Sequence, residues 1–227
     1  MASRPTISAC VVTQDRAPLL PRLLANLAPA VDEIVVVDGG SRDDSLEILR
    51  AHPAVRCGVR AFDNITRQKN HAISLARGDW VLVVDTDELL SDSLRAALPG
   101  LVRACRKRWY KLPRYWIAAE DPPRYVRAEP LYPDFQLRLF KNLPFFRYSD
   151  DRALHEHFPK EGRGPGAKIR GTCHIFHLDF LLHDRARREA KVARYDALDP
   201  RARDVNAMYL WEDRPHELRA CEEPWPS

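Results

Sequence analysis

The chain has 227 residues, which is enough for one large α/β domain, or for a domain with a helical tail, around a buried core. Its 45% hydrophobic and 30% charged residues are typical of a water-soluble enzyme, and no apolar run approaches the roughly 18 residues of a membrane span. The net charge is +4 and no known nucleic-acid motif accompanies the basic residues, so we expect no nucleic-acid partner.

The first hundred residues alternate between strand-like and helix-like patterns. Short runs rich in β-branched residues predict buried strands at residues 6–13 and 33–38, within 52–59, and at 80–84. Helical spacing and end signals predict helices at residues 19–27, 41–50 and 66–76, and from about residue 91 onwards. This alternation favours an α/β fold, with a Rossmann-like, mainly parallel sheet flanked by helices. Ligands of such sheets bind outside the carboxyl ends of the strands.

From about residue 109 the pattern changes. Residues 110–118 and 125–140 are strand-like, but five prolines interrupt them and the segment between: Pro113, Pro122, Pro123, Pro130 and Pro133. This composition predicts antiparallel ribbons and loops that cover a site. We expect residues 161–171 to form a mobile, glycine-rich basic loop, residues 183–198 a charged C-terminal helix, and residues 201–227 an appended tail.

The N-terminus and the cysteines both indicate a reducing compartment. The first fifteen residues lack the charged, then apolar, then small-residue order of a secretory signal. The five cysteines are scattered and include no CxxC pair: Cys10, Cys57, Cys105, Cys173 and Cys221. We therefore expect a cytoplasmic protein without a disulfide framework or a zinc knuckle.

Two groups of basic residues stand out along the chain: Arg103, Arg106, Lys107 and Arg108, and then Arg185, Arg187, Arg188 and Lys191. A group of this kind is most often a solvated face. The alternative is attraction to an anionic acceptor or to the inner face of a membrane, which would give the protein a peripheral membrane contact.

Acidic residues end two of the predicted strands. Asp85 and Asp87 directly follow the strand at residues 80–84, with Glu88 beside them, and Asp38 ends the strand at residues 33–38. Carboxylate oxygens suit Mg²⁺ or Mn²⁺, which neutralise a diphosphate and make it a better leaving group. An Asp-x-Asp pair alone is a weak signal, because such pairs are common in acidic loops. The prediction of a metal site depends on the position of this pair at the end of a buried strand.

Four segments, in order, resemble the family 2 glycosyltransferases: residues 7–13 (ISACVVT), 31–41 (VDEIVVVDGGS), 67–70 (RQKN) and 76–88 (ARGDWVLVVDTDE). The likeness is greatest to the branch that includes the lipopolysaccharide core β-glucosyltransferases. Further segments extend it: residues 132–141 (YPDFQLRLFK), 154–156 (LHE) and 177–179 (HLD), with Lys191, Arg194 and Tyr195. The resemblance covers roughly residues 5–198 and leaves the tail unexplained.

The resemblance implies a GT-A fold with a Pro-rich acceptor half. Residues 1–200 would form one glycosyltransferase domain, in which residues 1–100 bind the nucleotide sugar and residues 101–200 supply acceptor and catalytic groups. The implied reaction is transfer of a hexose, with inversion, from a nucleoside diphosphate sugar to a glycan, a lipid-linked or a small-molecule acceptor. A UDP-sugar is the expected donor, and Mn²⁺ or Mg²⁺ the expected cofactor.

The same resemblance implies which residues bind the donor. Thr13 and Asp38 match positions that contact the nucleotide, and Asp38 would accept a hydrogen bond from the N–H of a uracil-type base. Arg67 matches a residue that approaches the base or the diphosphate. The alternatives are that Asp38 caps a helix and that Arg67 is a surface residue of a helix.

Asp15, Asp85 and Thr86 complete the implied donor site. The family often has Asn-Glu after the first strand where this chain has Gln14 and Asp15, so the contact at Asp15 departs from the family pattern. His177 resembles the late histidine that completes the metal site with Asp85 and Asp87, because a neutral imidazole can complement two carboxylates. The alternative for His177 is a hydrogen-bonded core histidine.

An inverting transferase needs a base that takes the proton from the attacking hydroxyl group. Two carboxylates are candidates, Glu156 and Asp134, and we favour Glu156 because it follows the strand-like residues 136–140, where this fold tends to place its catalytic carboxylate. The alternatives are a turn residue for Asp134 and a paired surface acid for Glu156.

Two other functions remain open at this point. A nucleotidyltransferase would have a Gly-rich phosphate loop after the first strand, whereas residues 13–16 (TQDR) contain no glycine. A catalytically degenerate GT-A scaffold is the non-enzymatic alternative, and the intact Asp38, Asp85 and Asp87 argue against it.

Overall fold

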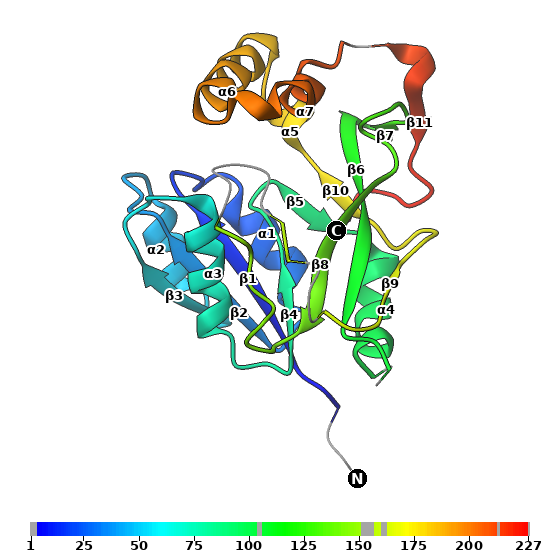
Figure 1. Ribbon diagram of the computed structural model, residues 1–227. Coiled ribbons are helices and arrows are strands. Elements are labelled where there is room, and N and C mark those ends of the chain that lie inside the picture. The colour runs from blue at the N-terminus through cyan, green and yellow to red at the C-terminus, as the bar shows by residue number, and fades with distance from the viewer. Residues whose placement is uncertain (1–3, 104–105, 151–156, 160–162, 213, 227) are drawn as a thin grey trace.

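The parallel half of one mixed sheet forms from the apolar runs of the first hundred residues (Figure 1). The computed structural model describes residues 4–103, 106–150, 157–159, 163–212 and 214–226. Four strands lie side by side in the order β4-β1-β2-β3 and run parallel: β1 (Ile7–Thr13), β2 (Glu33–Asp38), β3 (Val55–Val59) and β4 (Trp80–Val83). The centre of β2, residues 34–37, is fully buried, as expected for a parallel strand covered on both faces.

Helices cover both faces of this half. The face with Ile7, Ala9 and Val11 packs against three helices: α1 (Leu20–Leu27), α2 (Ser45–Ala51) and α4 (Asp92–Arg103). The other face packs against α3 (Ile65–Leu75) and against aromatic residues that follow β8. The expected α/β fold with a mixed sheet between helices is therefore confirmed.

The second half of the sheet is antiparallel. β8 (Asp134–Lys141) pairs with β4, and the order continues through β6 (Trp109–Glu120), β7 (Pro123–Val126) and β11 (Leu218–Ala220). The strand expected at residues 125–140 is in fact two strands, because Pro130 and Pro133 between them have no N–H for a strand ladder. Pro113 lies inside β6, so the interruption expected there is wrong.

Three short strands complete the sheet. β10 (Ile175–His177) runs parallel to β6 and antiparallel to β5 (Glu88–Leu90), and β9 (Gly166–Lys168) runs parallel to the start of β6. Because β9 pairs with β6, the expectation of a mobile loop is wrong for this part of residues 161–171.

The segment after residue 200 is part of the fold and not an appended tail. β11 extends the sheet beside β7, and the ring of Trp225 packs edge-on against Phe176 with the centroids 5.2 Å apart. The carboxylate of Glu223 accepts a hydrogen bond from the N–H of Ser93 at the start of α4.

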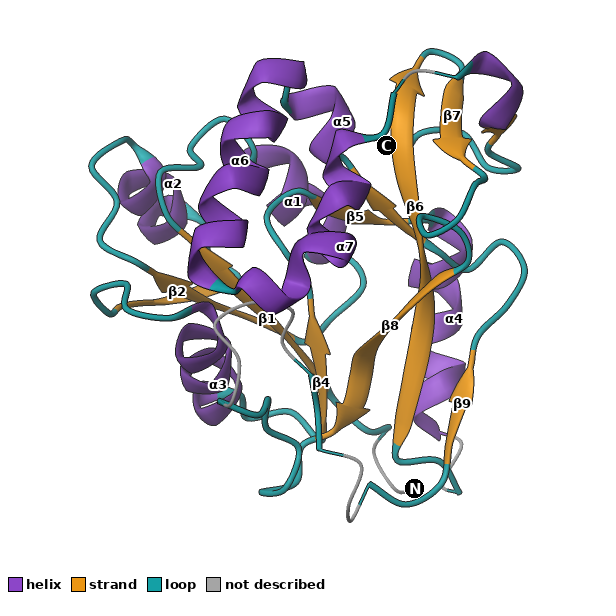
Figure 2. Cartoon of the chain, turned by 45° about the horizontal axis from the view of Figure 1, so that its top comes forward, coloured by secondary structure: helices purple, strands orange, loops and turns teal. Residues whose placement is uncertain are grey.

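The chain between β10 and β11 forms a helical layer above the carboxyl ends of the strands (Figure 2). It contains α5 (Asp179–Leu182), α6 (Arg185–Leu198), α7 (Arg203–Asn206) and the 3₁₀ turns η1 (Pro200–Ala202) and η2 (Ala207–Leu210), while the turn η3 (Pro215–Glu217) lies beside β7 and β11. Arg185 and Arg188 of α6 donate to the carbonyls of Tyr209, Leu210 and Trp211, so these two basic residues hold η2 in place.

Two expectations about location can be compared with the structure. Four cysteines, Cys10, Cys57, Cys173 and Cys221, are free, and Cys105 lies outside the described residues. In the part of the chain that the structure describes, no helix is long and apolar enough to span a bilayer.

Candidate functional site

A cavity of about 1630 Å³ opens at the carboxyl ends of the parallel strands, bounded by the start of α3 and by α6 and η2. Ligand pockets for one small molecule usually measure about 300–1,000 Å³, so this cavity has room for two substrates. Cations outnumber carboxylates among the described residues that line it. The cations are Arg16, Lys69, Lys111, Arg114, Arg138, Arg163, Lys191 and Arg194, and the acids are Asp15, Asp63, Asp85, Asp87 and Asp134. This excess of positive charge suits a polyanionic ligand such as a diphosphate.

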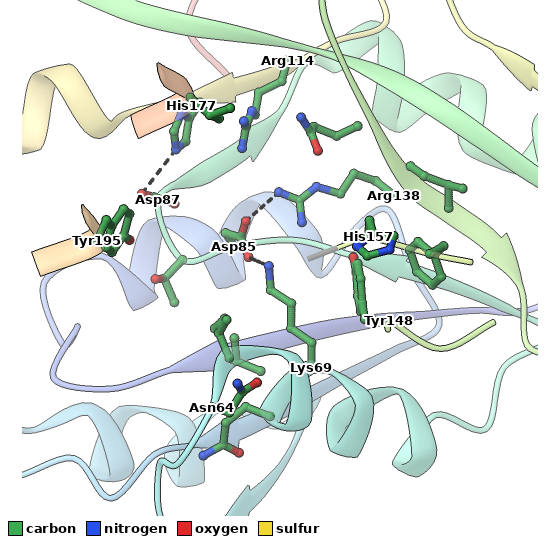
Figure 3. Close-up of a pocket in the computed structure, with 18 of the residues that line it drawn as sticks. Asn64, Lys69, Asp85, Asp87, Arg114, Arg138, Tyr148, His157, His177 and Tyr195 are labelled. Atoms are coloured by element: carbon green, nitrogen blue, oxygen red, sulfur yellow. Dashed lines mark hydrogen bonds and ion pairs between the residues drawn. The ribbon is translucent and has the colours of Figure 1, made fainter. Parts of the chain in front are cut away.

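Asp85 lies between two cations at the centre of the cavity (Figure 3). Its Oδ1 atom lies 2.8 Å from Nζ of Lys69, and its Oδ2 atom accepts from Nη2 of Arg138 at 2.6 Å. The same Nη2 atom lies 2.6 Å from Oε1 of the fully buried Glu88. Burial opposes ionisation of Asp85, but Arg138 and Lys69 outweigh it and hold the pKa of the carboxyl well below its usual range.

Asp87 lies next to His177, because β10 pairs with β5 directly after Asp87. Nε2 of His177, on β10, lies 3.5 Å from Oδ2 of Asp87. Burial opposes ionisation of Asp87, but the neighbouring His177 outweighs it, so the pKa of the carboxyl is lowered. The His177 ring stands at 86° to that of Trp116, and its Nδ1 atom has no hydrogen-bond partner among the described residues.

The Asp87 and His177 pair fits a divalent cation. Two ligand atoms that are each about 2.1 Å from an octahedral ion, at right angles, lie about 3.0 Å apart, close to the observed 3.5 Å. Among the described residues no group of three His, Cys, Asp or Glu converges on one point. The expected set of three ligands therefore differs from the observed geometry, because both oxygens of Asp85 are occupied by Lys69 and Arg138.

Asp134 is surrounded by donors. Its carboxylate accepts from Nε of Arg114 at 2.7 Å, from Nε1 of Trp116 at 3.0 Å and from the amide of Gln136. Burial opposes its ionisation, but Arg114 and these hydrogen bonds outweigh it and lower the pKa. A carboxylate stabilised in this way is a weak proton acceptor. The other base candidate, Glu156, lies outside the described residues.

Thr13, Asp15 and Thr86, which the resemblance implies are donor-binding residues, line the cavity. The hydroxyl of Thr13, at the end of β1, has no hydrogen-bond partner among the described residues. Asp15 has a φ of 52°, an uncommon conformation that Asp tolerates better than most residues, and its Oδ1 atom accepts from the N–H of Arg42 at 2.7 Å.

Asp38 and Arg67 lie away from the cavity wall. Asp38 is fully buried, and its Oδ1 atom accepts from the N–H groups of Gly40 at 2.8 Å and Ser41 at 2.7 Å. It therefore closes the turn after β2 and does not cap α2, whose N-cap residue is Asp44. This geometry does not support the expected contact with a base. The Arg67 side chain is 58% exposed and pairs with Asp150 at 2.8 Å, as a surface residue of α3 would.

Sequence reasoning missed the two cations that hold Asp85. Lys69 precedes Ala72 and Ile73 by three and four residues, so helical spacing places it on the buried face of α3. Arg138 stands between two leucines in β8 and is 4% exposed. A buried cation needs a charged partner, so these positions could have been identified as part of an acidic site.

The mixed sheet, the paired acids at a strand end and the cationic cavity fit the expected GT-A fold, and comparison with known proteins gives the family. The profile of Glycosyl transferase family 2 matches residues 8–153, so the chain belongs to that family.

Two relatives in sequence are similar to this chain over part of their length. A TPR repeat-containing protein of Synechococcus elongatus is 40% identical over 155 residues, which are 68% of this chain and 36% of that protein. An uncharacterized glycosyltransferase of Rickettsia felis is 36% identical over 89 residues, 39% of this chain and 31% of that protein. The chain thus spans about a third of the length of these relatives.

Solved structures share the fold at low sequence identity. TarS 1-349 of S. aureus in complex with UDP-GlcNAc has a TM-score of 0.54 at 15% identity, covering 90% of this chain and 70% of that one. The mannosyltransferase PcManGT of Pyrobaculum calidifontis, in complex with GDP-Man and Mn²⁺, has a TM-score of 0.59 at 16% identity, covering 94% and 67%.

Proposed function

We propose that this protein transfers a hexose from a UDP-sugar to a hydroxyl group of an acceptor, with inversion at the anomeric carbon. The observation that supports this proposal most directly is the cationic cavity of a family 2 chain. In this cavity Asp85 and Asp87 follow a buried strand. Asp85 contacts Lys69 and Arg138, and Asp87 contacts His177. The nucleotide sugars bound by TarS and PcManGT support this class of donor.

Donor binding is assigned to the residues of the cavity wall. We assign the nucleoside to Thr13, Asp15 and Thr86, since all three line the cavity and the Thr13 hydroxyl has no described partner. Lys69 and Arg138 supply positive charge for the diphosphate. Asp38 and Arg67 do not line the cavity. Asp38 holds the turn after β2, and Arg67 lies on the surface of α3.

A divalent ion, Mn²⁺ or Mg²⁺, would be held by Asp87 and His177 and by the donor's own phosphate oxygens, because such ions commonly use one or two carboxylates plus substrate phosphates. When bound, the ion would neutralise charge on the diphosphate. Asp85 serves as an oriented anion between Lys69 and Arg138 instead of as a primary ligand.

Glu156 is our proposed general base. It directly precedes His157, which lines the cavity, whereas the carboxylate of Asp134 is already engaged by three donors. Glu156 would take the proton of the acceptor hydroxyl group while the oxygen of that hydroxyl group bonds to the anomeric carbon. The bond from that carbon to the diphosphate oxygen breaks, and the cations of the cavity stabilise the diphosphate that leaves.

The branch and the location are proposals of the same kind. The motifs at residues 132–141 and 177–179 support membership of the lipopolysaccharide core β-glucosyltransferase-like branch. The proposed acceptor is a glycan, a lipid-linked or a small-molecule acceptor. We propose a cytoplasmic location, with a peripheral membrane contact through Arg103, Arg106 and Arg108, which are exposed. Arg185 and Arg188 are excluded from this contact because they hold η2.

The direct test is a donor screen. The protein is incubated with Mn²⁺ and a panel of UDP-, GDP- and ADP-sugars, and slow hydrolysis and thermal stabilisation are measured with and without chelator. We expect UDP-sugars to stabilise and to be hydrolysed in a metal-dependent way. The absence of both effects for every nucleotide sugar would overturn the proposal.

A further inference from the structure

One aromatic ring is exposed on the cavity wall, in the loop between β3 and α3. Phe62 lines the cavity and is 50% exposed. Among the described residues no aromatic or cationic side chain lies against its ring. A single exposed apolar residue on an open surface needs no explanation, but ligand pockets use aromatic rings for contact. The position of Phe62 inside the cavity therefore indicates a ligand with an apolar face.

Gln14 lies beside Phe62. A Cβ atom on Gly39, directly after β2, would lie 3.2 Å from Cβ of Gln14 and 3.2 Å from Cβ of Phe62. A side chain at position 39 would crowd both residues, so glycine allows them to come together. Gln14 lines the same cavity, and its side-chain amide has no hydrogen-bond partner within the described residues. The donor site proposed above uses neither Gln14 nor Phe62.

Backbone hydrogen bonds fix the two side chains relative to each other. The N–H of Gly39 donates to the carbonyl of Thr13 at 2.8 Å, and the N–H of Phe62 donates to the carbonyl of Gly39 at 3.1 Å. The segments that carry Gln14 and Phe62 are thus tied to the same turn after β2. A ligand that binds between them has little backbone to order, which favours its affinity.

The distance from this pair to Asp85 suits a nucleotide. Strands β2, β1 and β4 are neighbours in that order (Figure 1), so Gly39 and Asp85 follow strands that are two spacings apart, about 10 Å. A ribose and its first phosphate can span that length. Thr13 lies between the two ends, and its hydroxyl has no described partner. The cavity therefore offers an aromatic ring and an amide at one end and the cations Lys69 and Arg138 at the other.

We propose that the Phe62 ring stacks on the uracil base of the donor and that the Gln14 amide hydrogen-bonds with the edge of this base. An aromatic side chain stacks on the face of a base, and a carboxamide can accept from the N3–H of uracil while it donates to O4. Asp38 leaves this role open, because its oxygens meet the turn after β2. The inference rests on the proposed function, since it names the residues that recognise the base of the same donor.

The test is ligand binding by the full chain and by variants of the two residues. Calorimetric titrations with Mn²⁺ present give the affinities for UDP, UMP and pyrophosphate. We expect Phe62→Ala to weaken UDP and UMP binding by the same factor, about tenfold, which is the size of one lost base stack. Pyrophosphate binding should stay unchanged, because pyrophosphate has no base. Phe62→Trp should retain UDP affinity, and Gln14→Leu should reduce it by about fivefold.

Phe145→Ala is the matched control, because Phe145 is 43% exposed and is not among the described residues that line the cavity. It should bind UDP as the unaltered protein does. Unchanged UDP affinity in Phe62→Ala or in Gln14→Leu, or an equal loss of pyrophosphate binding, would overturn the proposal. In each of these results the unaltered protein still binds UDP. Failure of the unaltered protein to bind UDP would instead overturn the donor of the proposed function.

Discussion

Lys69 of α3 and Asp85 after β4 form a 2.8 Å ion pair that joins a helix on one face of the sheet to the loop at its carboxyl edge. The Lys69 side chain is only 7% exposed. Arg138 reaches the other oxygen of Asp85 from β8, so the parallel and antiparallel halves of the sheet meet at this carboxylate. A buried charge of this kind is stable only while its partners remain.

Replacing Arg138 with Gln should destabilise the protein. The change leaves the fully buried Glu88 and the carboxylate of Asp85 without their shared cation. We expect the free energy of unfolding to fall by about 3–5 kcal/mol, the usual result of removing one partner of a buried pair. Urea denaturation measures this, with Arg138→Lys as the milder control that keeps the charge. Wild-type stability in Arg138→Gln would show that Asp85 and Glu88 do not depend on Arg138.

Metal binding should depend on Asp87 and His177 more than on Asp85. Asp87→Asn and His177→Gln should each weaken Mn²⁺ binding in the presence of UDP by at least about tenfold, since even outer-sphere changes reach that size. Asp85→Asn should have a smaller effect, because its oxygens face Lys69 and Arg138. Titration of free Mn²⁺ by electron paramagnetic resonance distinguishes the variants. If Asp85→Asn weakens Mn²⁺ binding as much as Asp87→Asn does, the result would support the expected set of three ligands, with Asp85 included.

The two candidate bases should behave differently. Glu156→Gln should keep donor affinity and reduce transfer by about 10²–10⁴-fold, the usual contribution of a positioned acid or base. Asp134→Asn should instead lower stability, because Arg114 loses its closest carboxylate. Turnover and UDP affinity are measured for both variants. Loss of turnover in Asp134→Asn with full activity in Glu156→Gln would exchange the two roles.

Asp38 should prove to be a structural residue. Asp38→Ala removes the acceptor of the Gly40 and Ser41 N–H groups, so we expect the free energy of unfolding to fall by about 1–3 kcal/mol. The ratio of UDP to GDP affinity should stay unchanged, because Asp38 lies outside the cavity wall. Thermal unfolding and nucleotide titration test both points. Selective loss of UDP binding at unchanged stability would establish the base contact implied by the family resemblance.

His174 should make stability depend on pH. Burial lowers its pKa to about 4, from an ordinary value of 6.5. Between these values the unfolded chain binds the proton more readily, so the contribution is present above pH 6.5 and is lost as the pH falls toward 4. His174→Phe keeps a ring against Tyr115 and Phe176. It should reduce the change in the free energy of unfolding between pH 7 and pH 4 by about 3 kcal/mol. Denaturation of both proteins from pH 4 to 7 provides the comparison, and parallel curves would contradict it.

The order of strands and helices in the first hundred residues was predictable, because each element there has its own hydrophobic pattern and end signals. The positions of Asp85 and Asp87 followed from the strand before them. The split of residues 125–140 into β7 and β8 was not predicted, although Pro130 and Pro133 mark the place. Proline patterns locate an interruption more easily than they locate the strands on either side.

The roles of single side chains were less predictable, because they depend on contacts between distant parts of the chain. Asp38 has the sequence context of a nucleotide ligand, yet its oxygens meet the backbone of the turn that follows. Arg138 looked like an ordinary strand residue until β8 was placed beside β4. Arg138 is the cation that contributes most to keeping Asp85 ionised. It comes from a region whose pattern indicated only antiparallel ribbons.

The pairing of β10 with β5 has a consequence for the order in which the site can assemble during synthesis. Among the described residues β5 pairs with no strand other than β10, and Asp87 immediately precedes β5. A nascent chain that has reached residue 153, where the family profile ends, already contains both acids but not the strand that fixes their loop. The Asp87 end of the acidic loop can therefore reach its final geometry only after residues 175–177 have left the ribosome. A fragment cut at the profile boundary would keep the residues that hold Asp85 and lose the pair of Asp87 with His177.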